Sequence, residues 1–97
     1  MTTGKTLHPM NETRADWARV AVDAFGVETY AGRTFTGEAA EFQPGDNTEN
    51  SDAYTMIQDL IGDALHLATR HGWDAGEMIR KAVASFDYEN APEYAGD

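Results

Sequence analysis

Three polar side chains share one face of a predicted helix and could bind a divalent cation. Asp59, Asp63 and His66 follow one another at spacings of four and three residues, which places them along one ridge of an α-helix. Two carboxylates and an imidazole in that arrangement can hold a metal ion when a second segment supplies further ligands. Helical nucleotide hydrolases meet this need with acidic clusters on two paired helices. The candidates for a second cluster in this chain are Asp23, Glu28 and Glu77.

Because these candidates are scattered along the chain, we expect the ridge to be a solvated helix face that holds no metal and no cofactor. The sequence has no cysteine, which excludes thiolate zinc sites, iron–sulfur clusters and cysteine nucleophiles. It also lacks a glycine-rich phosphate loop, an HExxH pair and a Gly-x-Ser-x-Gly turn. The sequence therefore predicts a protein that is not an enzyme. A small metal-dependent nucleotide hydrolase is the enzymatic alternative.

Carboxylates dominate the middle of the chain. Between Thr34 and Thr69 the sequence has seven acidic residues and no lysine or arginine. Carboxylates spaced along a surface can imitate phosphates and occupy the basic groove of a nucleic-acid-binding protein. Tyrosines in or beside such a segment suit a protein contact site. The predicted partner-binding residues are Tyr30, Tyr54, Glu38, Glu41, Asp46, Glu49, Asp52, Asp59 and Asp63.

The net charge restricts the partners. The chain has 17 acidic residues against 7 Lys and Arg, for a net charge of −10. Such a field repels nucleic-acid backbones and anionic membranes, and it attracts basic protein surfaces. No apolar run is long enough to span a bilayer, and the first residues do not have the pattern of a signal peptide. We expect a cytoplasmic protein whose partner is positively charged, without direct binding to nucleic acid or to a membrane.

The first predicted helix begins near Asn11 or Thr13, which are both suitable N-cap residues, and stops at Gly26. Apolar residues recur in it at helical spacing and predict its buried stripe. These residues are Trp17, Ala18, Ala21, Ala24 and Phe25.

The segment 27–50 is ambiguous. Residues 27–30 and 33–36 flank Ala31-Gly32 and could pair as a short β-hairpin. Residues 38–42 could form one helical turn, and a proline- and glycine-containing loop follows.

The second and third predicted helices form a tight hairpin. The second has a wide apolar face, starts near Asn50 or Ser51 and ends at Gly72. The third opens on a capping box, with Asp74 as N-cap and Glu77 three residues later. The two residues that would form the hydrophobic staple of this box are Trp73 and Met78.

Several motifs carry a resemblance to a known group of proteins. They are the run from Asp59 to Ala68, the turn His71-Gly72-Trp73-Asp74, an alanine-bearing helix that ends in an aromatic residue and Glu89, and the pair Trp17-Ala18. Together they resemble small uncharacterised acidic helical proteins of phages, mobile elements and high-GC bacteria. The resemblance implies a helical fold and a mobile-element setting, but no activity and no catalytic residues. In general character the chain is similar to anti-CRISPR and anti-restriction inhibitors.

We therefore predict a mainly α fold of three helices with a C-terminal helical hairpin, in which a small β-hairpin could lie between the first two helices. Residues 11–90 are predicted to form a single helical domain. Residues 1–10 are predicted to be a flexible tail, and residues 91–97 a flexible acidic C-terminus.

The predicted function is that of a small acidic inhibitor. It would bind a positively charged host defence protein, such as a CRISPR effector or a restriction enzyme, by mimicry of nucleic acid. A dimeric scaffold or regulatory accessory protein is a third possibility beside the hydrolase. The chain would be a monomer or a homodimer.

Overall fold

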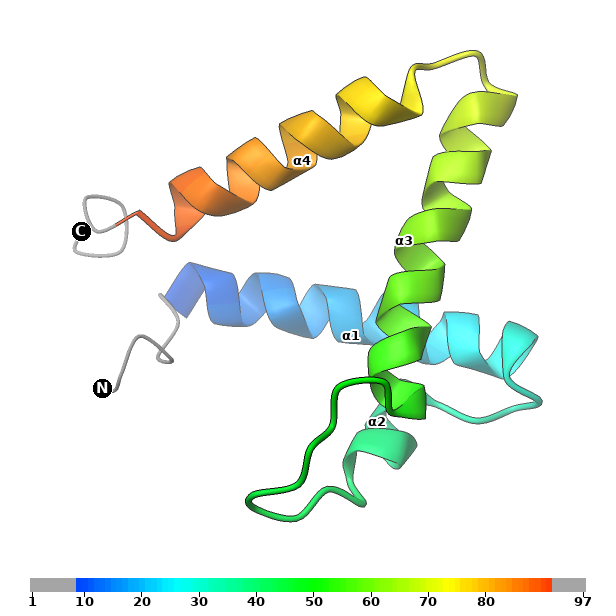
Figure 1. The fold of residues 1–97 in the computed structure, drawn as a ribbon, viewed down its shortest axis with the longest axis vertical. Coiled ribbons are helices and arrows are strands. Elements are labelled where there is room, and N and C mark those ends of the chain that lie inside the picture. The colour runs from blue at the N-terminus through cyan, green and yellow to red at the C-terminus, as the bar shows by residue number, and fades with distance from the viewer. Residues whose placement is uncertain (1–8, 92–97) are drawn as a thin grey trace. The chain divides into compact units, whose positions relative to one another are not determined.

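The computed structural model describes residues 9–91, and these residues form helices joined by turns and loops (Figure 1). The helices are α1 (Pro9–Thr29), α2 (Phe35–Ala39), α3 (Asp52–Arg70) and α4 (Ala75–Glu89). The described residues contain no β-strand. The mainly helical fold class is therefore confirmed, with four helices where three were predicted.

The chain divides into two compact units, which are described separately. The central unit is Trp17–Ala64, and the described part of the terminal unit comprises residues 9–16 and 65–91. The predicted tails lie largely outside the described residues, although Pro9 and Met10 already belong to α1. Proline suits a first helical turn, because the amide hydrogen that it lacks would have no helical acceptor there.

The small β-hairpin is not formed. The residues of its first predicted strand continue α1, and those of its second begin α2. Helix α1 continues through Gly26 to Thr29 and closes with a hydrogen bond from the Gly32 amide to the Val27 carbonyl. Gly32 has a positive φ of 86° there. Thr34 then acts as the N-cap of α2, since its Oγ1 accepts a hydrogen bond of 3.0 Å from the Gly37 amide. A threonine that favours strands is equally suited to cap a helix.

Gly26 allows a close approach of backbone instead of stopping the helix. It is buried, and a Cβ atom at this position would overlap the Arg33 carbonyl oxygen and touch the Met56 methyl at 3.4 Å. The prediction that α1 ends at Gly26 is therefore wrong. The absence of a side chain lets the turn after α1 fold back onto the helix.

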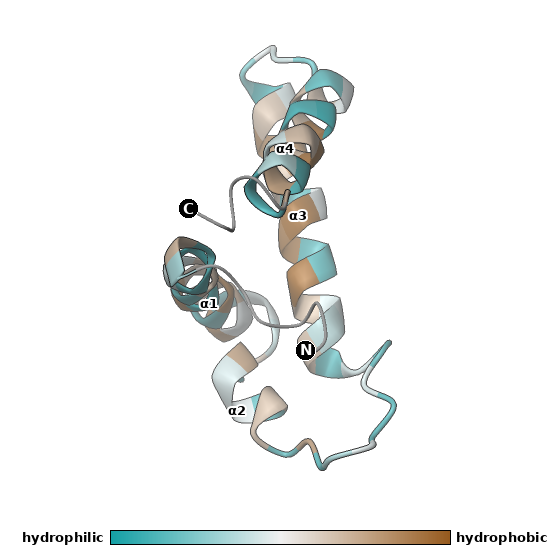
Figure 2. Ribbon diagram, turned by 90° about the vertical axis from the view of Figure 1, so that its left-hand side faces the viewer, coloured by the Kyte–Doolittle hydropathy of each residue, from teal (hydrophilic) through white to brown (hydrophobic). Residues whose placement is uncertain are grey.

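The core of the central unit lies between α1 and α3. Its buried apolar side chains are Val22, Ala53 and Met56, and Met56 is fully enclosed. Helix α3 is apolar over a wide face, seen as brown segments in Figure 2. On α1 the buried face is the one that carries Val22 and Gly26, whereas Trp17 is 63% exposed. The predicted buried stripe through Trp17 is thus wrong in its orientation around the helix.

The turn that joins α3 to α4 has the caps that the sequence predicted. Helix α3 ends in a Schellman motif, in which the Trp73 amide donates to the Ala68 carbonyl and the Gly72 amide to the Thr69 carbonyl. Gly72 has the positive φ of 81° that this motif requires. Asp74 caps α4 through a 2.9 Å hydrogen bond from the Glu77 amide.

Side chains near the start of α1 contact the end of α4, and both belong to the terminal unit. Asn11 is buried, and its side-chain amide donates a 2.9 Å hydrogen bond to the Glu89 carbonyl. Arg14 donates to the Asn11 side-chain oxygen at 2.9 Å and forms an ion pair of 3.5 Å with the Glu89 carboxylate. Asn11 was a candidate N-cap, but it instead satisfies a carbonyl at the end of another helix.

None of the helices within residues 9–91 combines the length and the apolar character that crossing a bilayer requires.

Replacement of Gly26 by alanine should destabilise the protein. The new methyl group would overlap the Arg33 carbonyl, and overpacking of this kind typically costs about 1–3 kcal/mol. Urea denaturation followed by circular dichroism measures the effect. Gly62→Ala is the matched control, because Gly62 also lies within a helix but no atom lies within 4 Å of the added Cβ. It should stabilise the protein by about 0.5–1 kcal/mol. Equal effects of the two substitutions would contradict the close approach at Gly26.

Removal of the α4 cap should destabilise the first turn of α4. In Asp74→Ala the Glu77 amide loses its acceptor, which typically costs about 1 kcal/mol. Asp74→Asn retains an acceptor oxygen and should cost less. Denaturation curves of the two variants test this order, and equal losses in Asp74→Ala and Asp74→Asn would show that charge rather than capping matters at this position.

Candidate partner-binding site

All seven predicted carboxylates lie in the central unit. Glu38 belongs to α2, and three residues on the loop that follows continue the acidic run. The remaining three lie on α3. In chain order, the loop residues are Glu41, Asp46 and Glu49, and the α3 residues are Asp52, Asp59 and Asp63.

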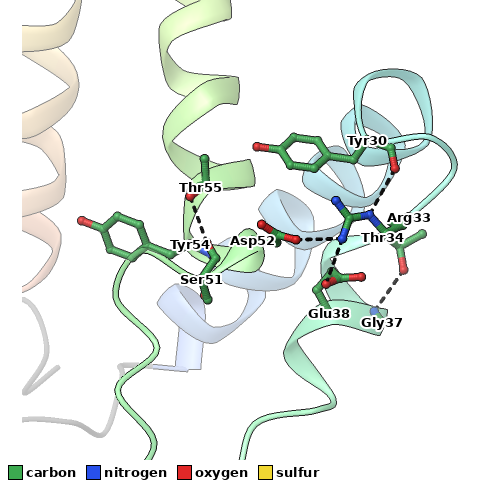
Figure 3. A network of polar contacts seen from close by, with 9 residues as sticks. All are labelled: Tyr30, Arg33, Thr34, Gly37, Glu38, Ser51, Asp52, Tyr54 and Thr55. Atoms are coloured by element: carbon green, nitrogen blue, oxygen red, sulfur yellow. Dashed lines mark hydrogen bonds and ion pairs between the residues drawn. The ribbon is translucent and has the colours of Figure 1, made fainter.

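Arg33 forms ion pairs with two of these carboxylates (Figure 3). Its guanidinium Nη1 lies 2.7 Å from the Asp52 carboxylate and 3.5 Å from that of Glu38. The same group lies over the Tyr30 ring at 5.6 Å. The hydrogen bond to Asp52 raises the pKa of Arg33 further above its ordinary value. Glu38 and Asp52 therefore carry less uncompensated charge than their neighbours in the acidic run.

Tyr30 and Asp59 form a direct pair. The phenol donates a 2.6 Å hydrogen bond to the Asp59 carboxylate, linking the residue that follows α1 to α3. This bond to a carboxylate favours the neutral phenol and raises the pKa of Tyr30 to about 12. Tyr30 was predicted to contact a partner, and in the structure its hydroxyl and ring both contact the central unit itself.

The loop carboxylates differ in their surroundings. Asp46 accepts a 2.7 Å hydrogen bond from the Gln43 amide and so stabilises its own turn. Glu41 and Glu49 are exposed and form no side-chain hydrogen bond or ion pair within residues 9–91. The same is true of Asp63 on α3. These three are the carboxylates most available to a cation from outside.

Asp23 is a carboxylate held in place by hydrogen bonds, and it lies outside the acidic run from which the partner-binding residues were predicted. It accepts 2.8 Å hydrogen bonds from both the amide and the hydroxyl of Thr36, and it forms an ion pair of 3.3 Å with Arg19. The backbone hydrogen bond from Thr36 contributes most to lowering the pKa of Asp23. The sequence offered Asp23 only as a metal ligand, since a contact across thirteen residues leaves no local pattern.

Tyr54 lies on another side of α3 from this network, and in Figure 3 its ring points away from Arg33. It is 45% exposed. Together with Ile57, Gln58 and Ile61 it lines a shallow depression of about 280 Å³. Tyr54 remains available to a partner, whereas Tyr30 is half-buried.

The structure gives no support to the metal alternative. No group of three or more His, Asp or Glu side chains within residues 9–91 is placed to hold a metal ion. Asp59, the first member of the predicted ridge, accepts the hydrogen bond from Tyr30.

Comparison of the chain with protein-family models, with curated proteins and with solved structures finds no match.

The Tyr30–Asp59 pair predicts a loss of stability at high pH. The phenol ionises near 10 in the unfolded chain and at about 12 in the folded protein, so the folded state holds the proton more tightly. This stabilisation is complete below pH 10 and is lost as the pH rises from 10 to about 12. The free energy of unfolding should therefore fall over this interval in the wild type and less in Tyr30→Phe.

Tyr54→Phe is the control for this measurement, because the Tyr54 hydroxyl makes no hydrogen bond to residues 9–91. Its unfolding curve should follow the wild type across the same interval. If Tyr30→Phe also follows the wild type, the pair does not hold the phenol proton in solution.

Proposed function

We propose that the protein is a non-enzymatic inhibitor that binds a cationic protein surface by mimicry of a nucleic-acid backbone. The observation that carries this proposal is the charge of the central unit. It contains nine acidic residues, and its only basic residues, Arg19 and Arg33, are both paired with carboxylates of the same unit. An incoming cationic protein therefore meets carboxylates without competing free cations.

The carboxylates have different roles in this proposal. Glu41, Glu49 and Asp63 act as the phosphate substitutes, because they are exposed and unpaired within the described residues. Asp46 and Asp59 add negative charge while each accepts a hydrogen bond that fixes its position. The pairing of Glu38 and Asp52 with Arg33 makes these two mainly structural.

The partner class follows from the chemistry of mimicry. A groove that binds nucleic acid is lined by Lys and Arg and gains affinity from neutralising regularly spaced anions. The proposed partner is a positively charged host defence protein, such as a CRISPR effector or a restriction enzyme. The acidic composition supports this choice.

Competition with DNA tests the proposal. A labelled DNA duplex is bound to a nuclease-inactive CRISPR effector or to a restriction enzyme, and its displacement is followed by fluorescence anisotropy at low and high salt. We expect displacement that weakens steeply with salt. The triple variant Glu41→Gln, Glu49→Gln and Asp63→Asn should displace DNA about tenfold less well.

A second triple variant serves as the matched control. Glu12→Gln, Asp16→Asn and Asp87→Asn remove the same number of charges from the terminal unit, and these changes should alter displacement by less than about twofold. If both triple variants displaced DNA equally less well, the displacement would depend on net charge and not on the three carboxylates of the central unit. Absence of displacement, or displacement that is independent of salt, would contradict mimicry.

A further inference from the structure

Helix α1 carries a second apolar stripe that the central unit does not bury. Trp17, Val20, Ala24 and Val27 follow one another at spacings of three, four and three residues. All four are exposed, and the three large side chains are 63%, 60% and 52% exposed in chain order. Alternation of three and four is the spacing of positions a and d in a helix that packs lengthwise against another helix. We call these four residues the α1 stripe.

The α1 stripe is separate from the face that packs in the central unit. Val22 and Gly26 are buried on that other face, where a Cβ atom at residue 26 would meet the Arg33 backbone and the Met56 side chain. Helix α1 is therefore apolar on two sides, and only one of them supplies the core described above. The stripe extends over eleven residues, or about 15 Å of helix, which matches about three turns of a facing helix.

The residues that flank the stripe define the charge of the helix that can pack there. With Trp17 and Ala24 at position a, the flanking positions e and g hold Ala21, Asp23 and Glu28, so every charged flank is acidic. Asp23 is held in place by Thr36, and its partner Arg19 lies further from the stripe around the helix.

A second copy of the chain is a poor occupant. In a parallel pair, Asp23 of one copy would face Glu28 of the other. In an antiparallel pair, position e meets e and position g meets g, so acidic flanks meet acidic or neutral flanks and never a base. Either orientation places like charges at the flanks, which disfavours pairing.

We propose that the α1 stripe binds an amphipathic helix of another protein, with apolar residues at positions a and d and lysine or arginine at the flanking positions. Apolar burial supplies the affinity, and the acidic flanks select a basic helix. This surface lies outside the acidic run of the proposed function. The α1 stripe would bind a basic helix, whereas the acidic run would bind the nucleic-acid-binding groove of a protein.

A synthetic peptide of three heptads tests this proposal on the full chain. The probe has Leu at a and d, Lys at e and g, and Ala or Gln elsewhere. Two companion peptides replace either every Leu by Gln or every Lys by Glu. Isothermal titration calorimetry measures affinity, and the emission of Trp17 in a Trp73→Phe background reports burial of the stripe. We expect one Leu/Lys peptide per chain, a blue shift of Trp17 emission, and much weaker binding of both companions.

Variants locate the peptide on the chain. Val20→Gln with Val27→Gln should weaken the Leu/Lys peptide by at least about tenfold. The matched control, Ile57→Gln with Ile61→Gln, replaces two side chains of α3 that are 42% and 47% exposed, and it should bind like the wild type. Glu28→Lys should shift the preference towards the Leu/Glu peptide. Circular dichroism verifies that each variant is folded.

Several outcomes would overturn the inference. One is a dimer in light scattering that the valine substitutions dissociate, since a second copy would then occupy the stripe. Unchanged affinity in the valine variant, or Trp17 emission that does not respond to the peptide, would also overturn it. The Gln/Lys peptide could also bind as tightly as the Leu/Lys peptide and lose that binding in the Glu41, Glu49 and Asp63 triple variant. This result would place the peptide on the acidic surface of the proposed function and would reject the α1 stripe as its binding site.

Discussion

The close approach of backbone at Gly26 is the constraint on which the central unit depends. Because residue 26 has no side chain, the carbonyl of Arg33 occupies the space beside α1 that a Cβ would need. This position brings the Arg33 guanidinium within reach of Asp52 at the start of α3 and of Glu38 on α2. The close approach at Gly26 thus accompanies the pairing of Arg33 with Glu38 and Asp52, and the other carboxylates remain as surface charge.

The polar contacts of the central unit connect its helices and leave its surface negatively charged. Arg33 connects α2 and α3, Tyr30 connects the end of α1 to α3, and Thr36 binds Asp23 of α1. Arg33 in these contacts and Arg19, which pairs with Asp23, are the two arginines of the unit, so both of its positive charges lie beside carboxylates. The acidity of the chain is therefore partly structural, and the excess over that need is available for recognition.

Local signals in the sequence were predictive, and long-range contacts were not. The turn between α3 and α4 was predicted because Gly72 and Asp74 act on backbone groups only a few residues away. The prediction of a β-hairpin was wrong because Thr34 suits a strand and a helix cap equally well. The predicted buried face of α1 was wrong because the helix has apolar residues on two sides, and their spacing alone does not tell which side is buried. The acidic run was visible in the sequence, but its pairing with Arg33 extends over nineteen residues and has no local pattern.

The hydrogen bond from Asn11 to Glu89 has a consequence for how the chain folds. It joins residues separated by 78 positions, whereas the caps of the α3–α4 turn join residues three to five positions apart. Closing so long a loop costs more chain entropy than closing a turn, so the capped turn can form early and the contact between Asn11 and Glu89 forms late. Completion of the terminal unit therefore requires both the first turns of α1 and the last turn of α4, and a nascent chain acquires this contact only after α4 has been synthesised.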